Sequence, residues 1–379
     1  MVPDALEADG TIASAVGGRS PERFRQEMFN YNLRCYNEHV FRRMKLACIY
    51  MERANMTGTV QLTDGTVSLD NLGKTLIHEH VIVGMPGWNL DLKAPPFVRS
   101  EAMARAVDRI QELQSFGCKT IIDPCPMDLG RDVEFVAELA GRTRTHIVCA
   151  TGVYNEEEGI PYTFRTMPRE DIVELYVKEI TEGVGDTGIK AGVIKIATGQ
   201  ETPTAYERKM IGVAAEVSCL TGVPIISHTQ IASGGTHQID IVEMHKGRAD
   251  CMIVGHSGDR DDHEYQKSIA ERGAFVGLDR FGLEMILADE IRMRNLVQLV
   301  KAGYAHRVVM SQDYPLCLKG RMGPDLARVA PKWSITHIFK TILPRLKELG
   351  LSDEDIETVL VANPKTLFAN AAAHARCTH

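Results

Sequence analysis

The stretch that decides the fold reads GVIKI at residues 192–196, PIIS at 224–227, MIVG at 252–255 and AFVGL at 274–278. Each run is short and almost continuously apolar, which is typical of a strand that is buried on both faces. Comparable runs lie on either side of this stretch, at Thr75–Ile77, Thr120–Ile122, Ile147–Ala150 and Arg307–Ser311. The chain therefore offers eight candidate strands.

Segments with helical periodicity separate these runs. Apolar residues recur at helical spacing over Met103–Leu113 and Ile172–Ile180, and each segment is followed by a glycine that ends it. Strands that alternate with helices form parallel β-α units, and eight such units favour a closed (β/α)8 TIM barrel, an α/β fold. An open doubly wound sheet is the alternative, but no G-x-G-x-x-G motif follows the first strand.

Residues 1–56 stand apart from the barrel pattern. They are densely charged and contain no strand-like run before Thr59, and the segment from about Pro21 to Arg53 favours one or two helices. We therefore predict an N-terminal helical extension over residues 1–56 and one barrel domain over residues 57–379, which opens with a β-hairpin around Asp64-Gly65. An appended element and an artefact of start-site choice are both open explanations of the extension.

The end of the chain carries clear helix signals. Ser352, followed by the acidic Asp353–Asp355, predicts an N-cap with negative charge on the first turn. Asn363-Pro364 predicts a break, because the residue before a proline disfavours helical backbone. We expect a separate, short final helix at Lys365–Ala373.

The composition is that of an ordinary soluble protein, with 44% hydrophobic and 25% charged residues. A net charge of −7 has the wrong sign for binding a nucleic-acid backbone, and no run approaches the ~18 apolar residues of a membrane span. The nine cysteines are scattered without a C-x-x-C pair, which indicates free thiols in a reducing compartment. We expect a cytoplasmic protein whose partner is a small-molecule substrate, with no nucleic-acid or membrane partner.

Polar residues gather where the candidate strands end, and the carboxyl ends of barrel strands are where such folds place their chemistry. His78 and His80 are two apart, so both rings face the barrel mouth while Glu79 points away. Each residue alone has an ordinary structural explanation, but clustered histidine and carboxylate favour a divalent metal: zinc first, with manganese, cobalt or iron as alternatives. The strand-end residues are His78 and His80, Lys195, His228, His256, Asp279 and Arg280, and Asp313.

Lys195 needs a chemical explanation, because an ammonium group repels cations and a neutral amine has a single lone pair. If its Nζ reacts with carbon dioxide, the product is a carbamate, an anion with two oxygens that can span two metal ions. Two metals about 3.5–4 Å apart lower the pKa of a shared water far enough to supply hydroxide at neutral pH. The pattern therefore predicts hydrolysis of an ester-like bond.

From about Val60 to Phe368 the sequence resembles the phosphotriesterase family of the amidohydrolase superfamily. Six motifs in family order carry the resemblance: TLIHEH at 75–80, GVIK at 192–195, SHT at 227–229, GHS at 255–257, GLDR at 277–280 and SQD at 311–313.

The resemblance implies roles for most of the strand-end residues. It implies that Asp313 contacts a bridging hydroxide and receives its proton, that Asp259 belongs to a proton relay, and that the protein is a homodimer. The implied metal ligands are His78, His80 and Asp313 for one ion and His228 and His256 for the other, with N6-carboxylated Lys195 bridging the two.

Two positions bear on the substrate. Family members that hydrolyse synthetic phosphotriesters fastest carry a histidine directly after the aspartate that follows the seventh candidate strand, here residues 274–278. They also carry a tryptophan shortly after the Thr-Gly that follows the third candidate strand, here Ile147–Ala150. This chain has Arg280 and Tyr154 there, as in the lactonase branch, whose members open lactones and often retain weak phosphotriesterase activity. A phosphotriester as the main substrate and a non-catalytic metal-binding barrel are the alternatives, and Arg280 could serve only to pair with Asp259 or Asp279.

Overall fold

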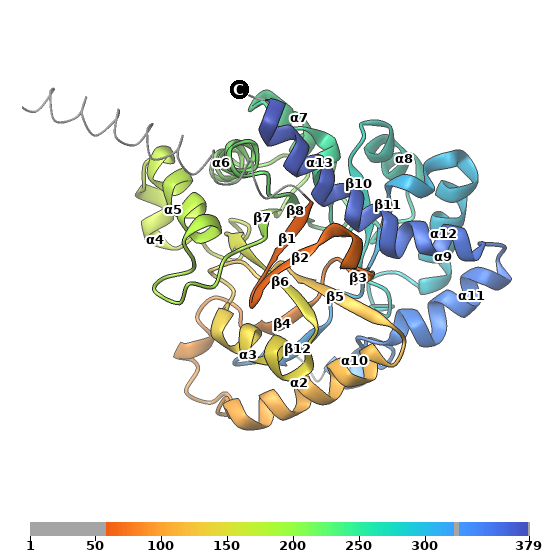
Figure 1. Cartoon of the computed structure of the whole chain (residues 1–379), viewed down its shortest axis with the longest axis horizontal. Helices are drawn as coiled ribbons and strands as arrows, with labels where there is room; N and C mark the ends of the chain where they lie inside the picture. Colours follow the sequence, from red (N-terminus) through yellow and green to blue (C-terminus); the bar gives the residue numbers. More distant parts are fainter. Residues whose placement is uncertain (1–57, 322–325, 378–379) are drawn as a thin grey trace, which may run out of the picture. The chain divides into compact units, whose positions relative to one another are not determined.

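The computed structural model describes residues 58–321 and 326–377, so the predicted extension over residues 1–56 lies outside the described residues. The main sheet has eight parallel strands, and every predicted run overlaps one of them, so the prediction of a TIM barrel is confirmed (Figure 1). In sheet order the strands are β3 (Lys74–Leu76), β5 (Cys118–Asp123), β6 (His146–Gly152), β7 (Val193–Thr198), β8 (Ile225–Thr229), β9 (Met252–Val254), β10 (Phe275–Leu278) and β11 (Val308–Met310).

The barrel closes between its first and last strands through a second, short sheet. After β3 the chain continues as β4 (His80–Val83), and after β11 it continues as β12 (Pro315–Leu318), and these two strands pair in parallel. Between the two sheets the Asp313 amide donates a hydrogen bond to the His78 carbonyl at 3.0 Å. The closure therefore brings two predicted metal ligands together.

Helices follow the strands and cover the outside of the barrel (Figure 1). α2 (Arg99–Gln114) and α5 (Arg169–Thr181) confirm the two helices predicted from periodicity. The other helices after the strands are α3 (Val133–Thr143), α6 (Ala205–Thr221), α7 (Gly235–Met244), α8 (His263–Glu271) and α9 (Asp289–Leu299), and shorter ones are α4 (Tyr162–Thr166), α10 (Leu326–Val329) and α11 (Leu343–Glu348).

The C-terminal helices follow one prediction and correct another. α12 (Asp353–Glu357) begins after Ser352, whose side chain forms the predicted cap. The predicted break at Asn363-Pro364 is wrong, because the chain continues through the π-helical segment η8 (Thr358–Ala362) into α13 (Asn363–Cys377) with helical backbone angles. A π turn is wider than an α turn, so the proline ring and its missing N–H are accommodated without ending the helix.

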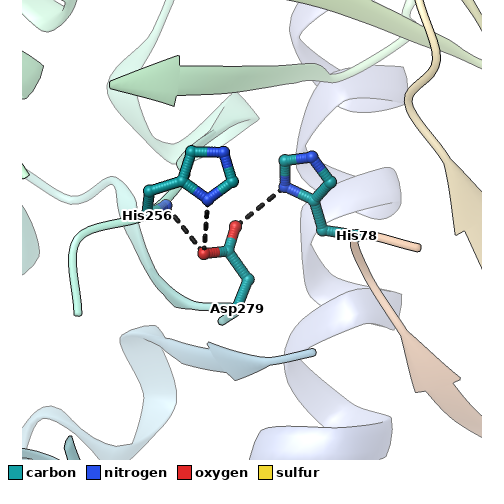
Figure 2. A group of neighbouring side chains, drawn as sticks. All are labelled: His78, His256 and Asp279. Carbon is teal, nitrogen blue, oxygen red and sulfur yellow. Dashed lines mark hydrogen bonds and ion pairs between the residues drawn. The ribbon is translucent and has the colours of Figure 1, made fainter. Parts of the chain in front are cut away.

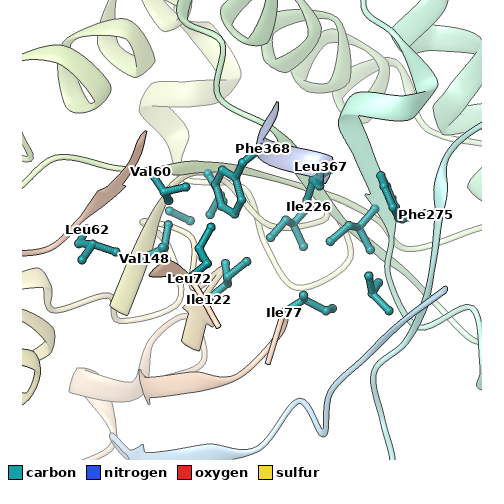
Figure 3. Close-up of a cluster of buried hydrophobic side chains, with 14 residues drawn as sticks. Val60, Leu62, Leu72, Ile77, Ile122, Val148, Ile226, Phe275, Leu367 and Phe368 are labelled. Carbon is teal, nitrogen blue, oxygen red and sulfur yellow. The ribbon is translucent and has the colours of Figure 1, made fainter. Parts of the chain in front are cut away.

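The amino end of the barrel is filled by apolar side chains (Figure 3). The predicted hairpin is present as β1 (Thr59–Leu62) and β2 (Gly65–Ser68), and Val60 packs with Leu367 and Phe368 of α13 against the interior of the barrel. Because this end is closed, the carboxyl ends of the strands are the open side. The interior residues come from seven of the eight strands and from Ile77, which directly follows β3; the strand residues are Ile122, Val148, Ala150, Val193, Ile226, Ile253, Phe275 and Val309.

Two expectations about the environment of the chain can be compared with the described residues. None of the helices in residues 58–321 and 326–377 is long and apolar enough to cross a membrane. The cysteines that the structure describes as free thiols are all buried: Cys118, Cys125, Cys149, Cys219, Cys251 and Cys317.

Shortening a buried side chain of α13 is expected to destabilise the barrel. Phe368 is 5% exposed, and Phe368→Ala should lower the free energy of unfolding by about 3–5 kcal/mol through lost burial and a residual cavity. Met244 on α7 is 71% exposed, so Met244→Ala should change that free energy by less than about 0.5 kcal/mol. Urea unfolding of the two variants measures the difference, and equal midpoints would contradict a packing role for α13.

Candidate metal centre and active site

A cavity of about 300 Å³ opens at the carboxyl ends of the strands. Apart from Gln230, its polar wall consists of predicted site residues, and its apolar wall is contributed by β4 and by the segments that follow β4, β5, β10 and β11. Of the predicted site residues, only Asp259 is absent from the lining. The polar lining residues are His78, His80, Tyr154, Lys195, His228, Gln230, His256, Arg280 and Asp313, and the apolar ones include Val83, Met85, Leu129, Leu283, Ile286 and Trp333.

Asp279 orients two of the imidazoles (Figure 2). One oxygen of its carboxylate lies 2.8 Å from His78 Nδ1, and the other lies 3.0 Å from His256 Nδ1 and accepts the His256 backbone N–H at 2.7 Å. All three side chains are buried, and the rings of His78 and His256 stack with centroids 4.8 Å apart. One carboxylate therefore fixes the rotation of two rings, one that follows β3 and one that follows β9.

This arrangement sets which imidazole nitrogen is available to a ligand. Burial, with a further contribution from Lys195, lowers the pKa of His78 to about 3, so the ring is neutral. Burial by itself would raise the pKa of Asp279, but His256 and His78 hold this pKa far below its usual range. Asp279 therefore remains a carboxylate that accepts from Nδ1–H. A neutral ring that donates its Nδ1–H to Asp279 presents its Nε2 lone pair to a metal ion.

Asp313 lies among these Nε2 atoms. One of its oxygens is 3.2 Å from His80 Nε2 and 3.6 Å from His78 Nε2, and the other is 3.8 Å from His256 Nε2. Both Asp313 and His256 have left-handed backbone, with φ of 54° and 58°. Non-glycine residues avoid this region unless their surroundings impose it, and such strain concentrates at functional sites.

Glu79 explains how Asp313 is held in place. As predicted, it points away from the mouth, and it is buried against the segment after β11. Its carboxylate accepts hydrogen bonds from the Ser311 hydroxyl and from the Gln312 and Tyr314 amides at 2.7–2.8 Å. The glutamate between the two histidines therefore ties strand one to the backbone on both sides of Asp313.

Lys195 is buried beside the same imidazoles. Its Nζ lies 3.0 Å from His78 Nε2, and burial lowers its pKa to about 8, with Asp313 and Asp279 opposing the shift. The neighbouring strand leaves room for it only because residue 152 is glycine: a Cβ there would lie 2.2 Å from the Lys195 carbonyl oxygen. A lysine with a lowered pKa has an appreciable fraction of neutral amine at physiological pH.

His228 and Tyr154 form the opposite side of the mouth. The ring of His228 lies edge-on to His256 with centroids 4.5 Å apart, and its Nε2 is 2.8 Å from Gln230 Oε1. The Tyr154 hydroxyl lies 3.1 Å from His228 Nδ1, and burial raises the pKa of that hydroxyl above its usual value. Tyr154 is therefore a protonated hydrogen-bond donor at the rim of the cavity.

Arg280 links two carboxylates. Its Nε donates to Asp313 at 2.8 Å and its Nη1 donates to Asp259 at 2.7 Å, so it makes the expected pair with Asp259 but not with Asp279. The second oxygen of Asp259 accepts from Arg292 at 3.1 Å. Asp259 is thus fully buried between two guanidinium groups, outside the cavity lining.

The assembled residues fit divalent metal ions. In the described part of the chain, one ligand atom each from His78, His80 and Asp313 lie within 4.8 Å of one another, and Lys195 and His256 adjoin them. Imidazole nitrogen with carboxylate oxygen is the donor set typical of zinc, manganese and cobalt sites. The grouping of His78 and His256 with Asp279 has a different explanation, because there the contacts are direct hydrogen bonds through Nδ1.

Sequence reasoning missed the supporting residues. The sequence marks Asp279 only as a strand-end residue without a role, and its two partners follow other strands, His78 after β3 and His256 after β9. Gln230 and Arg292 carried no signal, because one lies in a loop and the other inside the helical pattern of α9. The left-handed backbone of His256 and Asp313 could not be read from the sequence, since neither residue is a glycine.

Comparison with known proteins gives concordant matches. A family model described as the phosphotriesterase family matches residues 58–368. An aryldialkylphosphatase from Saccharolobus solfataricus is 34% identical over 80% of this chain and 97% of that protein, and a phospho-furanose lactonase from Mycoplasmopsis synoviae is 28% identical over 80% and 90%. The crystal structure of a mutant PTE-like lactonase from Deinococcus radiodurans is 34% identical, with a TM-score of 0.79 over 82% of this chain and 100% of that chain.

These matches cover the barrel from its opening hairpin to α13. They agree with the resemblance carried by the six motifs and with the position of those motifs at the carboxyl ends of the strands. A match of this extent and identity establishes that the chain belongs to the phosphotriesterase family, a family of binuclear metal enzymes, and that it is a hydrolase acting on ester bonds.

Proposed function

We propose that this protein opens the ring ester of a lactone and hydrolyses phosphotriesters as a slower side activity. The observation that carries the proposal is the pairing of Arg280 with Asp313, together with the Tyr154 hydroxyl beside His228. These are the two positions at which the lactonase branch differs from the fast phosphotriesterases. The names of the relatives agree with both activities, since one is an aryldialkylphosphatase and another a phospho-furanose lactonase.

We propose that two divalent ions, with zinc as the first candidate, are held by His78, His80 and Asp313 and by His228 and His256, with carboxylated Lys195 between them. The burial of Lys195 supports this role, because a lowered pKa increases the fraction of neutral amine that can react with carbon dioxide. When bound, divalent ions polarise the ester carbonyl and supply hydroxide at neutral pH.

The chain's own residues orient the substrate and handle the proton. Tyr154 donates toward the ring oxygen, and the apolar wall that includes Leu283 and Trp333 receives the acyl part. The Asp313 carboxylate, to which Arg280 donates, would take a proton from the attacking water. It would return this proton to the ring oxygen as the ring C–O bond breaks, so that the product is a hydroxy acid. An arginine does not give up its proton in proteins, so a relay through Arg280 to Asp259 is chemically unsuited, and we propose that Asp259 instead holds Arg280 in place.

A substrate panel tests the proposed function. Protein reconstituted with zinc, manganese or cobalt is assayed for kcat/KM on acyl-homoserine lactones, γ- and δ-lactones and paraoxon, with an Asp313→Asn variant as the control for contaminating activity. We expect the best lactone to exceed paraoxon. A clear preference for paraoxon would support the alternative of a phosphotriesterase, and metal content below about one equivalent with no hydrolysis would support a non-catalytic barrel.

Substitution of Arg280 is expected to shift selectivity. Arg280→His removes a permanent positive charge and the guanidinium group that bonds to both Asp313 and Asp259. It also introduces the residue type of the fast phosphotriesterases. The ratio of kcat/KM for paraoxon to that for the best lactone should rise by roughly tenfold, as expected when about 1.4 kcal/mol of transition-state stabilisation is redistributed. An unchanged ratio would leave Arg280 as a residue that only pairs with its neighbours.

We further propose that the protein is a cytoplasmic homodimer that acts on a small molecule and binds neither nucleic acid nor membrane. The net charge of −7 and the buried free thiols support this environment. Light scattering of the purified full-length chain measures its mass, and a monomeric value would exclude the dimer.

A further inference from the structure

A line of buried and partly buried charged groups runs from the active site to the beginning of α9. Asp313, Arg280 and Asp259 form its first part, as described above. Arg292 continues it, with Nη2 3.1 Å from Asp259 and Nη1 3.6 Å from Asp289. The side chains of Asp259 and Arg292 are completely inaccessible to solvent, so the attraction between their charges is weakly screened.

Arg292 also holds the strand-seven loop, residues 279–288, which joins β10 to α9. Its guanidinium donates to the carbonyls of Leu283 and Leu287. The same loop is held at Gly282, whose amide donates to Asp289 at 2.9 Å. Because Leu283 lines the cavity, the contacts of Arg292 reach the apolar wall as well as Arg280.

We propose that Arg292 is a positioning residue of the active site, whose one guanidinium sets both the direction of Arg280 toward Asp313 and the apolar wall formed by the strand-seven loop. The kinetic part of this inference rests on the proposed function, and the structural part does not. Arg292 touches neither the cavity nor any predicted metal ligand, so it acts through Asp259 and through the loop backbone.

The chemistry of the guanidinium group explains why this position suits arginine. Its planar fork presents donors in several directions, so one side chain can reach a carboxylate and two carbonyls at once. A lysine would supply the charge for Asp259 but not the geometry for the loop. If Arg292 is removed, one buried oxygen of Asp259 loses its partner, and the loop loses two of its contacts.

A fluorescence measurement reads the loop directly, without substrate or metal. The chain has two tryptophans, Trp88 and Trp333. Trp333 lines the cavity, and its backbone lies against Gly282 of the strand-seven loop, since a Cβ on that glycine would be 2.9 Å from Trp333 Cα. In a Trp88→Phe background, emission therefore reports on Trp333 alone.

The test compares Arg292→Met with a matched control. The side chain of Arg131 is 9% exposed and bonds through both terminal nitrogens to Glu179. It lies in the loop after β5 and makes no described hydrogen bond or ion pair with the strand-seven loop. In metal-free protein, Arg292→Met should raise acrylamide quenching of Trp333 about twofold, because the loop loses local stability, whereas Arg131→Met should leave it unchanged. Unchanged quenching in a folded Arg292→Met protein would overturn the proposal.

Kinetics separate the two effects of Arg292. Misplacement of about 1 Å can cost about 100-fold, so Arg292→Met should lower kcat/KM on the best lactone by about that factor, against less than about threefold for Arg131→Met. Arg292→Lys should recover most of kcat, because Asp259 regains a counter-charge, but KM for long-chain lactones should stay raised. Recovery of both constants, or of neither, would overturn the division of roles.

If Arg292→Met fails to fold, Asp289→Asn replaces it, because this change weakens the contacts with Gly282 and Arg292, and unchanged Trp333 quenching in that variant would overturn the proposal. If the wild-type protein hydrolyses neither lactones nor paraoxon, the proposed function fails, while the fluorescence comparison still decides whether Arg292 positions the loop.

Discussion

Lys195→Ala is expected to lose both metal ions and to lose activity by roughly 1000-fold, comparable to the largest effects of removing one charge-stabilising group. Lys195 is buried with its Nζ 3.0 Å from His78 Nε2, so alanine leaves a gap at the centre of the ligand set. Metal content is measured by plasma mass spectrometry after reconstitution, and activity is measured on the best lactone.

A small carboxylate should restore part of this activity. Alanine leaves a gap where the lysine side chain and its proposed carbamate would lie. Propionate can enter this gap, and its carboxylate offers two oxygens, as the proposed carbamate does. We expect activity to rise with propionate concentration and to saturate, together with recovered metal content. Full activity of Lys195→Ala without propionate would end the argument for a carbamate.

Lys319 provides the matched control. It is also a buried lysine, 8% exposed, but its Nζ donates to the Gly130 carbonyl at 3.0 Å and lies over the rings of Trp88 and Phe97. Lys319→Ala should lower stability while the metal content stays at the wild-type level. Equal metal loss in both variants would mean that general destabilisation, and not a missing ligand, explains the result for Lys195.

The barrel could be predicted from the sequence because its strands are buried on both faces. Such strands appear as uninterrupted apolar runs, and each of the predicted runs overlaps a strand of the structure. The sequence does not predict β4 and β12 as strands, because they form by pairing His80–Val83 with Pro315–Leu318, segments that lie far apart in the sequence. The same limitation applies to η8, where tertiary packing overrides the local signal of Pro364.

The candidate site also has one part that could be predicted from the sequence and another that could not. The candidate metal ligands could be brought together from the sequence because strand ends converge on one rim, and the predicted meeting of His78 and Asp313 is present although they are far apart in sequence. Their supports could not, because Asp279, Glu79 and Arg292 act through hydrogen bonds to residues from other strands. Such contacts have no periodicity, and they depend on backbone strain and burial that only the folded chain provides.

Asp279→Asn is expected to lower metal affinity and kcat/KM by about 100-fold or more, because substituting one support of a metal-binding histidine typically costs 10–100-fold and Asp279 supports two. The substitution keeps the size of the side chain and removes only its charge and one acceptor. The carboxylate accepts from Nδ1–H of both His78 and His256, whereas an amide has one accepting oxygen and one donating nitrogen.

The donating nitrogen would face one of the two rings and force that ring to carry its proton on Nε2 instead. The ring Nε2 is the nitrogen that must present a lone pair to the metal, so a ring protonated there no longer binds. One ligand is therefore lost without any change in packing. Asp123→Asn is the matched control: this buried carboxylate lies 3.4 Å from a single ring nitrogen, His80 Nδ1, so its substitution should cost about tenfold, clearly less than Asp279→Asn. Titration of apo protein with zinc, followed by calorimetry, measures both affinities, and equal losses in the two variants would show that Asp279 has no special control over the two rings.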